Sequence, residues 1–153
     1  MLRVEVVAAT PGHVAALARH LRAADRAEVW AAAHVGPAEA LGRSLAASPL
    51  AWTGLMDCRP ACMFGVGSGG PDWGRPWMLG TGLVERHAAA FLRRCRPQVA
   101  RMQAAYPLLI NHVDARNDAA IRWLRWLGFT IGTAAPWGAQ GLPFHPFWRW
   151  RHV

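Results

Sequence analysis

The sequence contains no lysine, so all 17 of its basic residues are arginine, set against only nine acidic residues. The formal charge of +8 therefore comes entirely from arginine. A strongly basic surface attracts nucleic acid. The compositional bias of a GC-rich genome raises the arginine content in the same way, so the charge alone does not establish an anionic partner.

Cysteine is scarce as well, and the three residues present are Cys58, Cys62 and Cys95. An odd number without a second ligand pair supports neither a disulfide framework nor a zinc site, so we predict reduced packing residues and no metal. No hydrophobic run approaches the roughly 20 residues that cross a bilayer, and the N-terminus lacks a signal-peptide pattern. We therefore expect a soluble, non-secreted protein that does not bind membranes.

What the chain does have is the composition of a globular domain. It has 153 residues, of which 53% are hydrophobic and 17% charged, and it has no internal repeat. This length buries one proper core and does not require a second. We predict a single domain over 1–153.

Local patterns give an order of elements. The expected strands are 2–9, 51–56 and 61–66 as a hairpin, 77–79, 108–113, 129–133 and 147–151. One expected helix follows Thr10-Pro11, and the others cover 27–33, 38–47, the region from Gly82 to Tyr106, and the segment from Asn117 to Gly128. Residues 67–76 are predicted to be a loop, and Pro97 is predicted to kink or split the longest helix. This order predicts an α/β fold with a mixed, mostly antiparallel sheet flanked by helices on both faces.

The segment from Asn117 to Phe129 reads Asn-Asp-Ala-Ala-Ile-Arg-Trp-Leu-Arg-Trp-Leu-Gly-Phe. It resembles the N-x-x-A-I-x-x-Y-x-x-x-G-F segment of GCN5-related N-acetyltransferases (GNAT proteins). The hairpin from Trp52 to Val66 is similar to the second and third strands of that fold, with Cys58 at a turn position where such proteins usually have glycine. The resemblance covers nearly the whole chain and implies the GNAT fold.

The resemblance also implies a cofactor site, from which this chain departs. GNAT enzymes place Arg or Gln three residues before a G-x-G/A turn that holds the diphosphate of acetyl-CoA. Here Trp77 precedes Gly80-Thr81-Gly82, and Leu124 stands where the general-acid tyrosine is usual. If acetyl-CoA binds, we expect Gly80, Thr81 and Gly82 at its phosphates and Asn117 near its pantetheine arm. Otherwise this turn is simply a helix cap.

A narrower resemblance is to the small internal-virion-protein family of short-tailed bacteriophages. It rests on the hairpin sequence D-x-R-P-A-x-M-F-G-V, the Trp-Met-Leu-Gly-Thr stretch from Trp77, Glu85-Arg86-His87, and the segment from Arg122 to Phe129. It implies an acetyltransferase-like protein without catalysis or cofactor that acts in virion structure or assembly. An acetyl-CoA-dependent N-acetyltransferase is the alternative. The expected location is the host bacterial cytoplasm, or the virion.

Weak catalytic candidates lie on two elements. Glu85 and His87 near the start of the long helix, with His112 and Asp114 on the following strand, are placed to converge where an amine would be deprotonated. The competing structural interpretation is that Glu85 complements the helix dipole and that His112 and Asp114 simply share one strand face.

An interaction surface is the last candidate. It consists of the arginines of the long helix and two nearby tryptophans: Arg93, Arg94, Arg96, Arg101, Trp123 and Trp126. These residue types suit contacts with virion or assembly proteins, or with nucleic acid, and a solvated helix face or packing on the sheet explains them equally well. An enzyme requires an open space between the backbones of Leu79 and Ile110 and a free helix N-terminus, whereas a structural protein can fill that cleft with Trp77 or other side chains.

Overall fold

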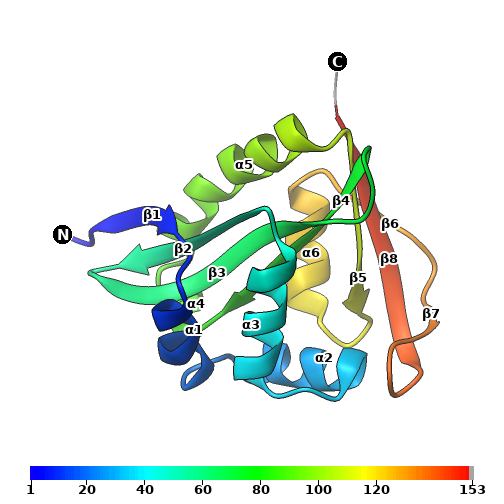
Figure 1. The fold of residues 1–153 in the computed structure, drawn as a ribbon, viewed down its shortest axis with the longest axis horizontal. Helices are drawn as coiled ribbons and strands as arrows, with labels where there is room; N and C mark the ends of the chain where they lie inside the picture. Colours follow the sequence, from blue (N-terminus) through cyan, green and yellow to red (C-terminus); the bar gives the residue numbers. More distant parts are fainter. Residues whose placement is uncertain (152–153) are drawn as a thin grey trace.

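A computed structural model describes residues 1–151 of the chain (Figure 1). Its strands are β1 (Val4–Ala8), β2 (Leu50–Met56), β3 (Arg59–Ser68), β4 (Trp73–Gly80), β5 (Leu108–Asp114), β6 (Thr130–Ile131), β7 (Ala135–Trp137) and β8 (Leu142–Trp150). Its helices are α1 (Pro11–Ala18), α2 (Ala23–Ala33), α3 (Pro37–Ala47), α4 (Gly82–Arg86), α5 (Ala88–Ala105) and α6 (Asp118–Trp126).

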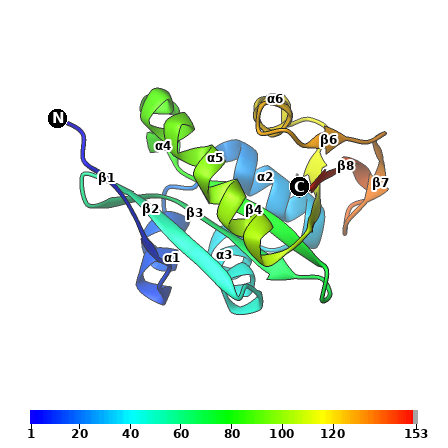
Figure 2. The same cartoon turned by 90° about the horizontal axis from the view of Figure 1, so that it is seen from above.

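Over the described residues the strands form one sheet in the order β1-β2-β3-β4-β5-β8-β6, with β7 pairing on β8. Every pairing is antiparallel except that of β4 with β5. Helices α1 and α3 cover one face, and α4, α5 and α6 cover the other (Figure 2), while α2 lies at the ends of β4 and β5. This arrangement confirms the predicted mixed α/β fold with helices on both faces.

The core has two parts, one on each face of the sheet. The larger part lies under α5 and α6, where Val99, Leu109 and Ile121 are buried. The smaller part lies under α1 and α3, where Leu17, Leu41 and Met63 are buried. Each helix therefore buries its apolar side against the sheet, as expected from its periodicity.

Thr10 and Asn117, the residues from which the sequence predicted helices to start, both cap those helices. Thr10 accepts a hydrogen bond from the His13 N–H at the start of α1, and Asn117 accepts one from the Ala120 N–H at the start of α6. Gly128 ends α6 with φ +91°. The β2–β3 hairpin turns through Asp57 and Cys58, both with positive φ, so Cys58 does adopt the left-handed conformation that glycine adopts more easily.

Several boundaries predicted from the sequence were wrong, including that of the last strand, since β8 begins at Leu142 and not at residue 147. The predicted loop 67–76 is mostly strand, because β3 continues to Ser68 and β4 begins at Trp73. Gly67 pairs with Arg75 within this ladder, so glycine and proline did not interrupt it. Helix α2 begins at Ala23 rather than at Ala27, because Arg22 precedes it without a side-chain cap that the sequence would reveal.

The long helix is split at His87, where φ −117° and ψ 46° separate α4 from α5. Pro97 was predicted to kink or split the helix, and it does not split it, since it lies inside continuous α5. Pro97 is on the exposed side of that helix, where the carbonyl left without an N–H partner can be hydrated.

Strands β4 and β5 pair only at Trp73 with Leu108 and at Gly74 with Leu109. Beyond this point the Asn111 side-chain amide donates to the Pro76 carbonyl across the gap, at 2.9 Å. In an extended strand the N–H and C=O of one residue point to the same side. Because the Pro76 carbonyl points toward β5, an N–H at this position would also have pointed toward β5, and proline has none. Proline thus helps end the pairing, and the two strands separate toward Gly80 and Asp114.

Candidate functional site

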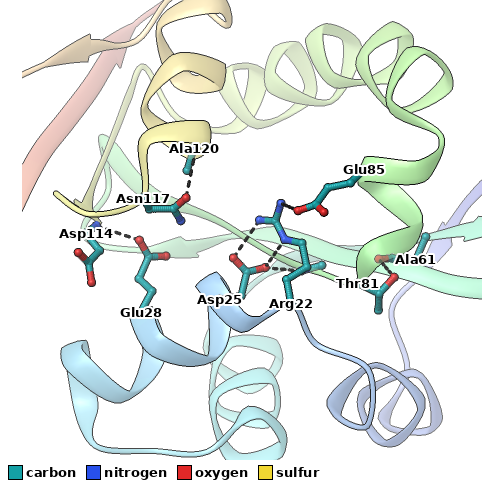
Figure 3. Close-up of polar contacts among 10 residues, drawn as sticks. Arg22, Asp25, Glu28, Ala61, Thr81, Glu85, Asp114, Asn117 and Ala120 are labelled. Atoms are coloured by element: carbon teal, nitrogen blue, oxygen red, sulfur yellow. Dashed lines mark hydrogen bonds and ion pairs between the residues drawn. The ribbon is translucent and has the colours of Figure 1, made fainter.

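A cleft of about 540 Å³ opens where β4 and β5 separate. Its walls come from both strands and from α4, α5 and α6, and α2 closes it at the ends of the two strands. Most of the lining side chains are apolar, including Met78, Phe91 and Trp123. The polar groups are concentrated where α2 approaches the ends of the two strands, as Figure 3 shows.

Asp25 on α2 connects to the end of β4. Its Oδ2 accepts from the Gly80 N–H at 2.8 Å, and its Oδ1 lies 2.9 Å from the Arg22 guanidinium (Figure 3). The Arg22 N–H donates in turn to the Gly80 carbonyl. Asp25 is 2% exposed, so this carboxylate is a buried, fully paired part of the structure.

Glu28, one helical turn further along α2, connects to the end of β5. Its Oε1 accepts from the Asp114 N–H at 2.8 Å, and Asn117 lies beside it (Figure 3). The pKa of Glu28 is raised to about 7, chiefly by burial and in addition by the negative charges of Asp25 and Asp114. The hydrogen bond from the Asp114 amide and the Asn117 side chain oppose this rise. Glu28 is therefore a carboxyl group that both binds and releases a proton near neutral pH.

Asp114 behaves in the opposite way. Burial raises the pKa of Asp114, but hydrogen bonds and charge from Arg116 outweigh burial, and the pKa lies below its usual value. The Arg116 guanidinium is 2.7 Å from Asp114 Oδ2. Asp114 thus stays ionised at neutral pH and holds the turn between β5 and α6.

Of the three remaining catalytic candidates, Glu85 and His112 line the cleft, whereas His87 stands at the break between α4 and α5 and is not among the lining residues. Glu85 is at the cleft, with its side chain 69% exposed and 3.3 Å from Arg22. His112 also lines the cleft, and its ring stacks on Trp137 with 4.3 Å between centroids. Burial, followed by the positive charge of Arg75, lowers the pKa of His112, so its ring is neutral at pH 7.

The turn Gly80-Thr81-Gly82 is only partly available to a ligand. The Gly80 N–H is bonded to Asp25, the Thr81 N–H donates to the Ala61 carbonyl, and Thr81 Oγ1 accepts from the Leu83 N–H. Gly82 is different, since nothing lies within 4 Å of a Cβ built on it. The exposed start of α4 at Gly82 therefore borders open space.

Trp77 does not fill the cleft. Its indole N–H donates to Ser48 Oγ at 2.8 Å, and the ring packs with the smaller part of the core under α3. Leu124, at the position of the usual tyrosine, is 7% exposed and packs in the larger part. Neither residue offers a proton donor to the cleft.

The two buried cysteines are unsuited to nucleophilic chemistry. Burial raises the pKa of the Cys62 thiol to about 12 and that of the Cys95 thiol to about 11, so both stay protonated at neutral pH. Among residues 1–151 there is no cluster of three or more side chains that could hold a metal ion. Within the same residues no helix is both long enough and apolar enough to span a membrane.

The predicted Arg/Trp surface is divided by the fold. Trp123 turns inward and packs on Phe91 at 5.7 Å, whereas Trp126 is 41% exposed and lies under the Arg96 guanidinium at 4.1 Å. Arg101 stacks on Trp52 of β2 at 4.5 Å, away from α6. Arg93 is exposed, and Arg94 lines the cleft.

Sequence reasoning missed Asp25 and Glu28. They are three positions apart and therefore on one side of a helix, in an otherwise alanine-rich segment, which is the signal that would have found them. The predicted helix began two residues after Asp25, so the pair was not recognised.

No protein-family model matches the chain, and no curated protein matches it in sequence. Its fold, however, is shared with solved acetyltransferases. An N-acetyltransferase from Staphylococcus aureus is 13% identical with a TM-score of 0.69, covering 97% of this chain and 98% of that one. The ribosomal-protein-S18-alanine N-acetyltransferase from Escherichia coli is 11% identical with a TM-score of 0.68, covering 99% of this chain and 96% of that one.

A Bacillus subtilis acetyltransferase solved in complex with CoA is 8% identical, with a TM-score of 0.68 over 99% of this chain and 100% of that one. At these identities the comparisons establish a common fold. The chain has the GNAT fold over nearly its whole length.

Proposed function

We propose that this protein transfers an acetyl group from acetyl-CoA to a primary amine, with Glu28 as the general base. The observation that carries the proposal is the carboxyl group of Glu28 at the separation of β4 and β5, where burial raises its pKa to about 7. A general base is most effective when its pKa lies near the working pH. A structural carboxylate such as Asp114 has no need of this shift.

The cleft fits the cofactor that the fold implies. Its apolar lining suits the pantetheine arm, and the open space beyond Gly82 leaves room for the diphosphate. The buried indole N–H of Trp123 lines the cleft beside the Cys95 thiol and has no oxygen or nitrogen acceptor within residues 1–151, so a bound carbonyl or amide can accept from it. The backbone N–H and C=O groups of successive residues in a strand point to alternate sides. The backbone groups of Met78, two residues before Gly80, therefore point into the cleft as those of Gly80 do, where they can bond to an amide of the pantetheine arm.

Bound acetyl-CoA supplies an activated acetyl thioester. The side chain of Glu28 accepts a proton from the attacking amine, while the Asp114 amide keeps the carboxylate oriented through its hydrogen bond. The missing tyrosine does not prevent this reaction, because a thiol has a pKa of roughly 8.5 and leaves readily as the thiolate.

The test is release of free CoA thiol with acetyl-CoA and a panel of amines, comparing the wild type with Glu28→Gln. Glutamine keeps the oxygen that accepts from Asp114 but cannot take a proton, so we expect kcat to fall roughly 10²-fold to 10⁴-fold with little change in acetyl-CoA binding. In the wild type, kcat/KM should rise with pH and level off above about 7, where Glu28 is ionised.

Glu85→Gln is the matched control, because it removes a carboxylate that also lines the cleft but is largely exposed. It should retain most of the activity. Equal losses in both variants, or no binding of acetyl-CoA at millimolar concentration, would contradict the proposal.

The role in virion assembly expected from the sequence stays a prediction. The solved structures described above are acetyltransferases, which favours the enzymatic alternative. The position of Trp77 against α3 also leaves the cleft open, as catalysis requires.

A further inference from the structure

The net charge is confined to one part of the chain. Residues 1–85 contain seven arginines and seven acidic residues, whereas residues 86–153 contain ten arginines and only two acidic residues, so the excess of eight positive charges lies entirely in the second segment. This segment forms α5, β5, α6 and the strands that follow. A mutational bias toward arginine would not by itself produce such a separation.

Few arginines of this segment are paired with an acid, and several are bonded to neutral groups instead. Within residues 1–151, Arg116 is the only one of the ten that forms an ion pair. Arg96 donates to the Trp126 carbonyl, Arg149 to the Gln103 side chain, and Arg151 to the Gln103 and Ala104 carbonyls. These bonds fix the guanidinium groups in place without neutralising their charge.

Three of these guanidinium groups meet in one hollow. A groove of about 300 Å³ between α5 and β8, here called the basic groove, is lined by Arg96, Ala100, Gln103, Ala104, Arg149 and Arg151. Arg93 continues the same exposed side of α5, one turn before Arg96. The two sites share no lining residue, because the basic groove uses the side of α5 that carries Arg96 and Ala100, whereas the cleft uses the buried side that carries Val99 and Met102. Helix α5 therefore separates the basic groove from the cleft (Figure 1).

An exposed aromatic ring borders the basic groove. Trp126 of α6 is 41% exposed, and the Arg96 guanidinium lies 4.1 Å from its ring centroid. Positively charged grooves beside an accessible aromatic ring are typical of surfaces that bind single-stranded nucleic acid, where phosphates contact arginine and a base stacks on the ring. An acidic polypeptide would match the charge but would make no use of Trp126.

We propose that the basic groove binds single-stranded nucleic acid, independently of the acetyl-transfer site. Arg93, Arg96, Arg149 and Arg151 contact successive phosphates, and Trp126 stacks on a base. With about four phosphates neutralised, the logarithm of the affinity should fall with the logarithm of salt concentration with a slope of about −3.

The test is fluorescence anisotropy of labelled 12-nucleotide single-stranded DNA and RNA of mixed sequence, from about 50 to 300 mM salt. We compare the full-length wild type with the double variant Arg93→Gln/Arg96→Gln, and with Trp126→Ala. The control is Arg19→Gln/Arg59→Gln, which removes two exposed arginines from the charge-neutral segment. All variants are checked for unchanged unfolding by circular dichroism.

We expect Arg93→Gln/Arg96→Gln to weaken binding at least about tenfold and to reduce the salt slope by about 1.4, and Trp126→Ala to weaken binding without changing the slope. The control should bind as the wild type does. Equal weakening in the control, or absence of binding at 50 mM salt, would overturn the proposal. The proposal would also be overturned if polyglutamate of equal charge displaced the oligonucleotide and Trp126→Ala bound the oligonucleotide as the wild type does. Those two results together would mean that the groove suits an acidic polypeptide.

Discussion

Helices α2 and α5 both carry charged side chains, but they place them in different surroundings. On α2, the carboxylates of Asp25 and Glu28 turn toward the sheet and bind the backbone at the ends of β4 and β5. On α5, Arg93 and Arg96 lie on the exposed side, and the helix contains no acidic residue.

This difference separates two uses of charge. Buried charges interact strongly with their neighbours because water does not screen them, so removing or protonating one changes stability and reactivity. Exposed charges interact weakly with the rest of the fold and remain available to a partner. We therefore expect substitutions on α2 to act on folding and catalysis, and substitutions on α5 to act on binding.

The largest effect on stability is expected from Asp25→Ala. This change leaves the Gly80 N–H and the Arg22 guanidinium without their buried partner, so the free energy of unfolding should fall by about 3 to 5 kcal/mol. Urea denaturation measures this loss of unfolding free energy. Glu39→Ala, which removes an exposed carboxylate paired with Arg43 on α3, is the control and should cost about 0.5 kcal/mol or less. Similar losses in the two variants would contradict a difference between buried and exposed pairs.

Glu28→Gln should stabilise the protein, but only at higher pH. Between the ordinary pKa of 4.5 and the folded-state pKa of about 7, the folded protein holds a proton on Glu28 that the unfolded chain has released. Stability is therefore lost as the pH rises through this window, and the loss reaches its full value above pH 7. Glutamine carries no charge and does not suffer this loss of stability. The free energy of unfolding of the variant should therefore exceed that of the wild type by up to about 3 kcal/mol at pH 8 and should equal it at pH 4.

Denaturation of both proteins across this pH range measures the difference. A constant difference at all pH values would mean that Glu28 has an ordinary pKa and would also weaken its assignment as a general base.

Gly82→Glu should weaken acetyl-CoA binding without unfolding the protein. The position faces open space and its φ is not positive, so a side chain is accommodated, while its carboxylate repels the diphosphate. Isothermal titration should show at least a tenfold loss, or about 1.4 kcal/mol. Gly82→Gln controls for size and should lose less. If both variants bind as the wild type does, the phosphates do not lie at this turn.

The smallest effect is expected from neutralising the exposed arginines of α5. Like charges on one surface repel each other, so Arg93→Gln should raise stability by about 0.5 kcal/mol or less at low salt, and 0.5 M salt should remove the gain. Thermal unfolding at two salt concentrations measures this. A loss of stability in Arg93→Gln would show that the arginine makes a stabilising contact.

Much of the fold could be predicted because its signals are local. The Thr10 and Asn117 caps, the β2–β3 hairpin and the segment ending at Gly128 each depend on residues close together in the sequence. Element boundaries were less accurate where pairing overrode composition, as in the glycine-rich stretch that β3 and β4 incorporate. Proline at position 97 suggested a break, but the break occurred at His87, where no residue type signals it.

The candidate site could be predicted only in part. Gly82, Asn117 and His112 were found because the motif or the strand pattern marked them. Asn117 and His112 line the cleft, and Gly82 lies at the exposed start of α4. Glu28 was missed because its chemistry comes from groups distant in sequence, the Asp114 amide being 86 positions away. The different environments of Trp123 and Trp126 also depend on residues far away in the sequence. The two positions are close together on α6, and nothing in the sequence indicated that one side chain would pack inside and the other remain exposed.

The sequence by itself determined the order of the elements, the caps, the turns and the excess of arginine, because these follow from residue type and short-range spacing. Only the tertiary structure decided which carboxyl group would titrate near neutral pH and which arginines would meet in one groove. A pKa depends on burial and on nearby charges, and a groove depends on which elements pack together, so both are set by contacts between residues that are far apart along the chain.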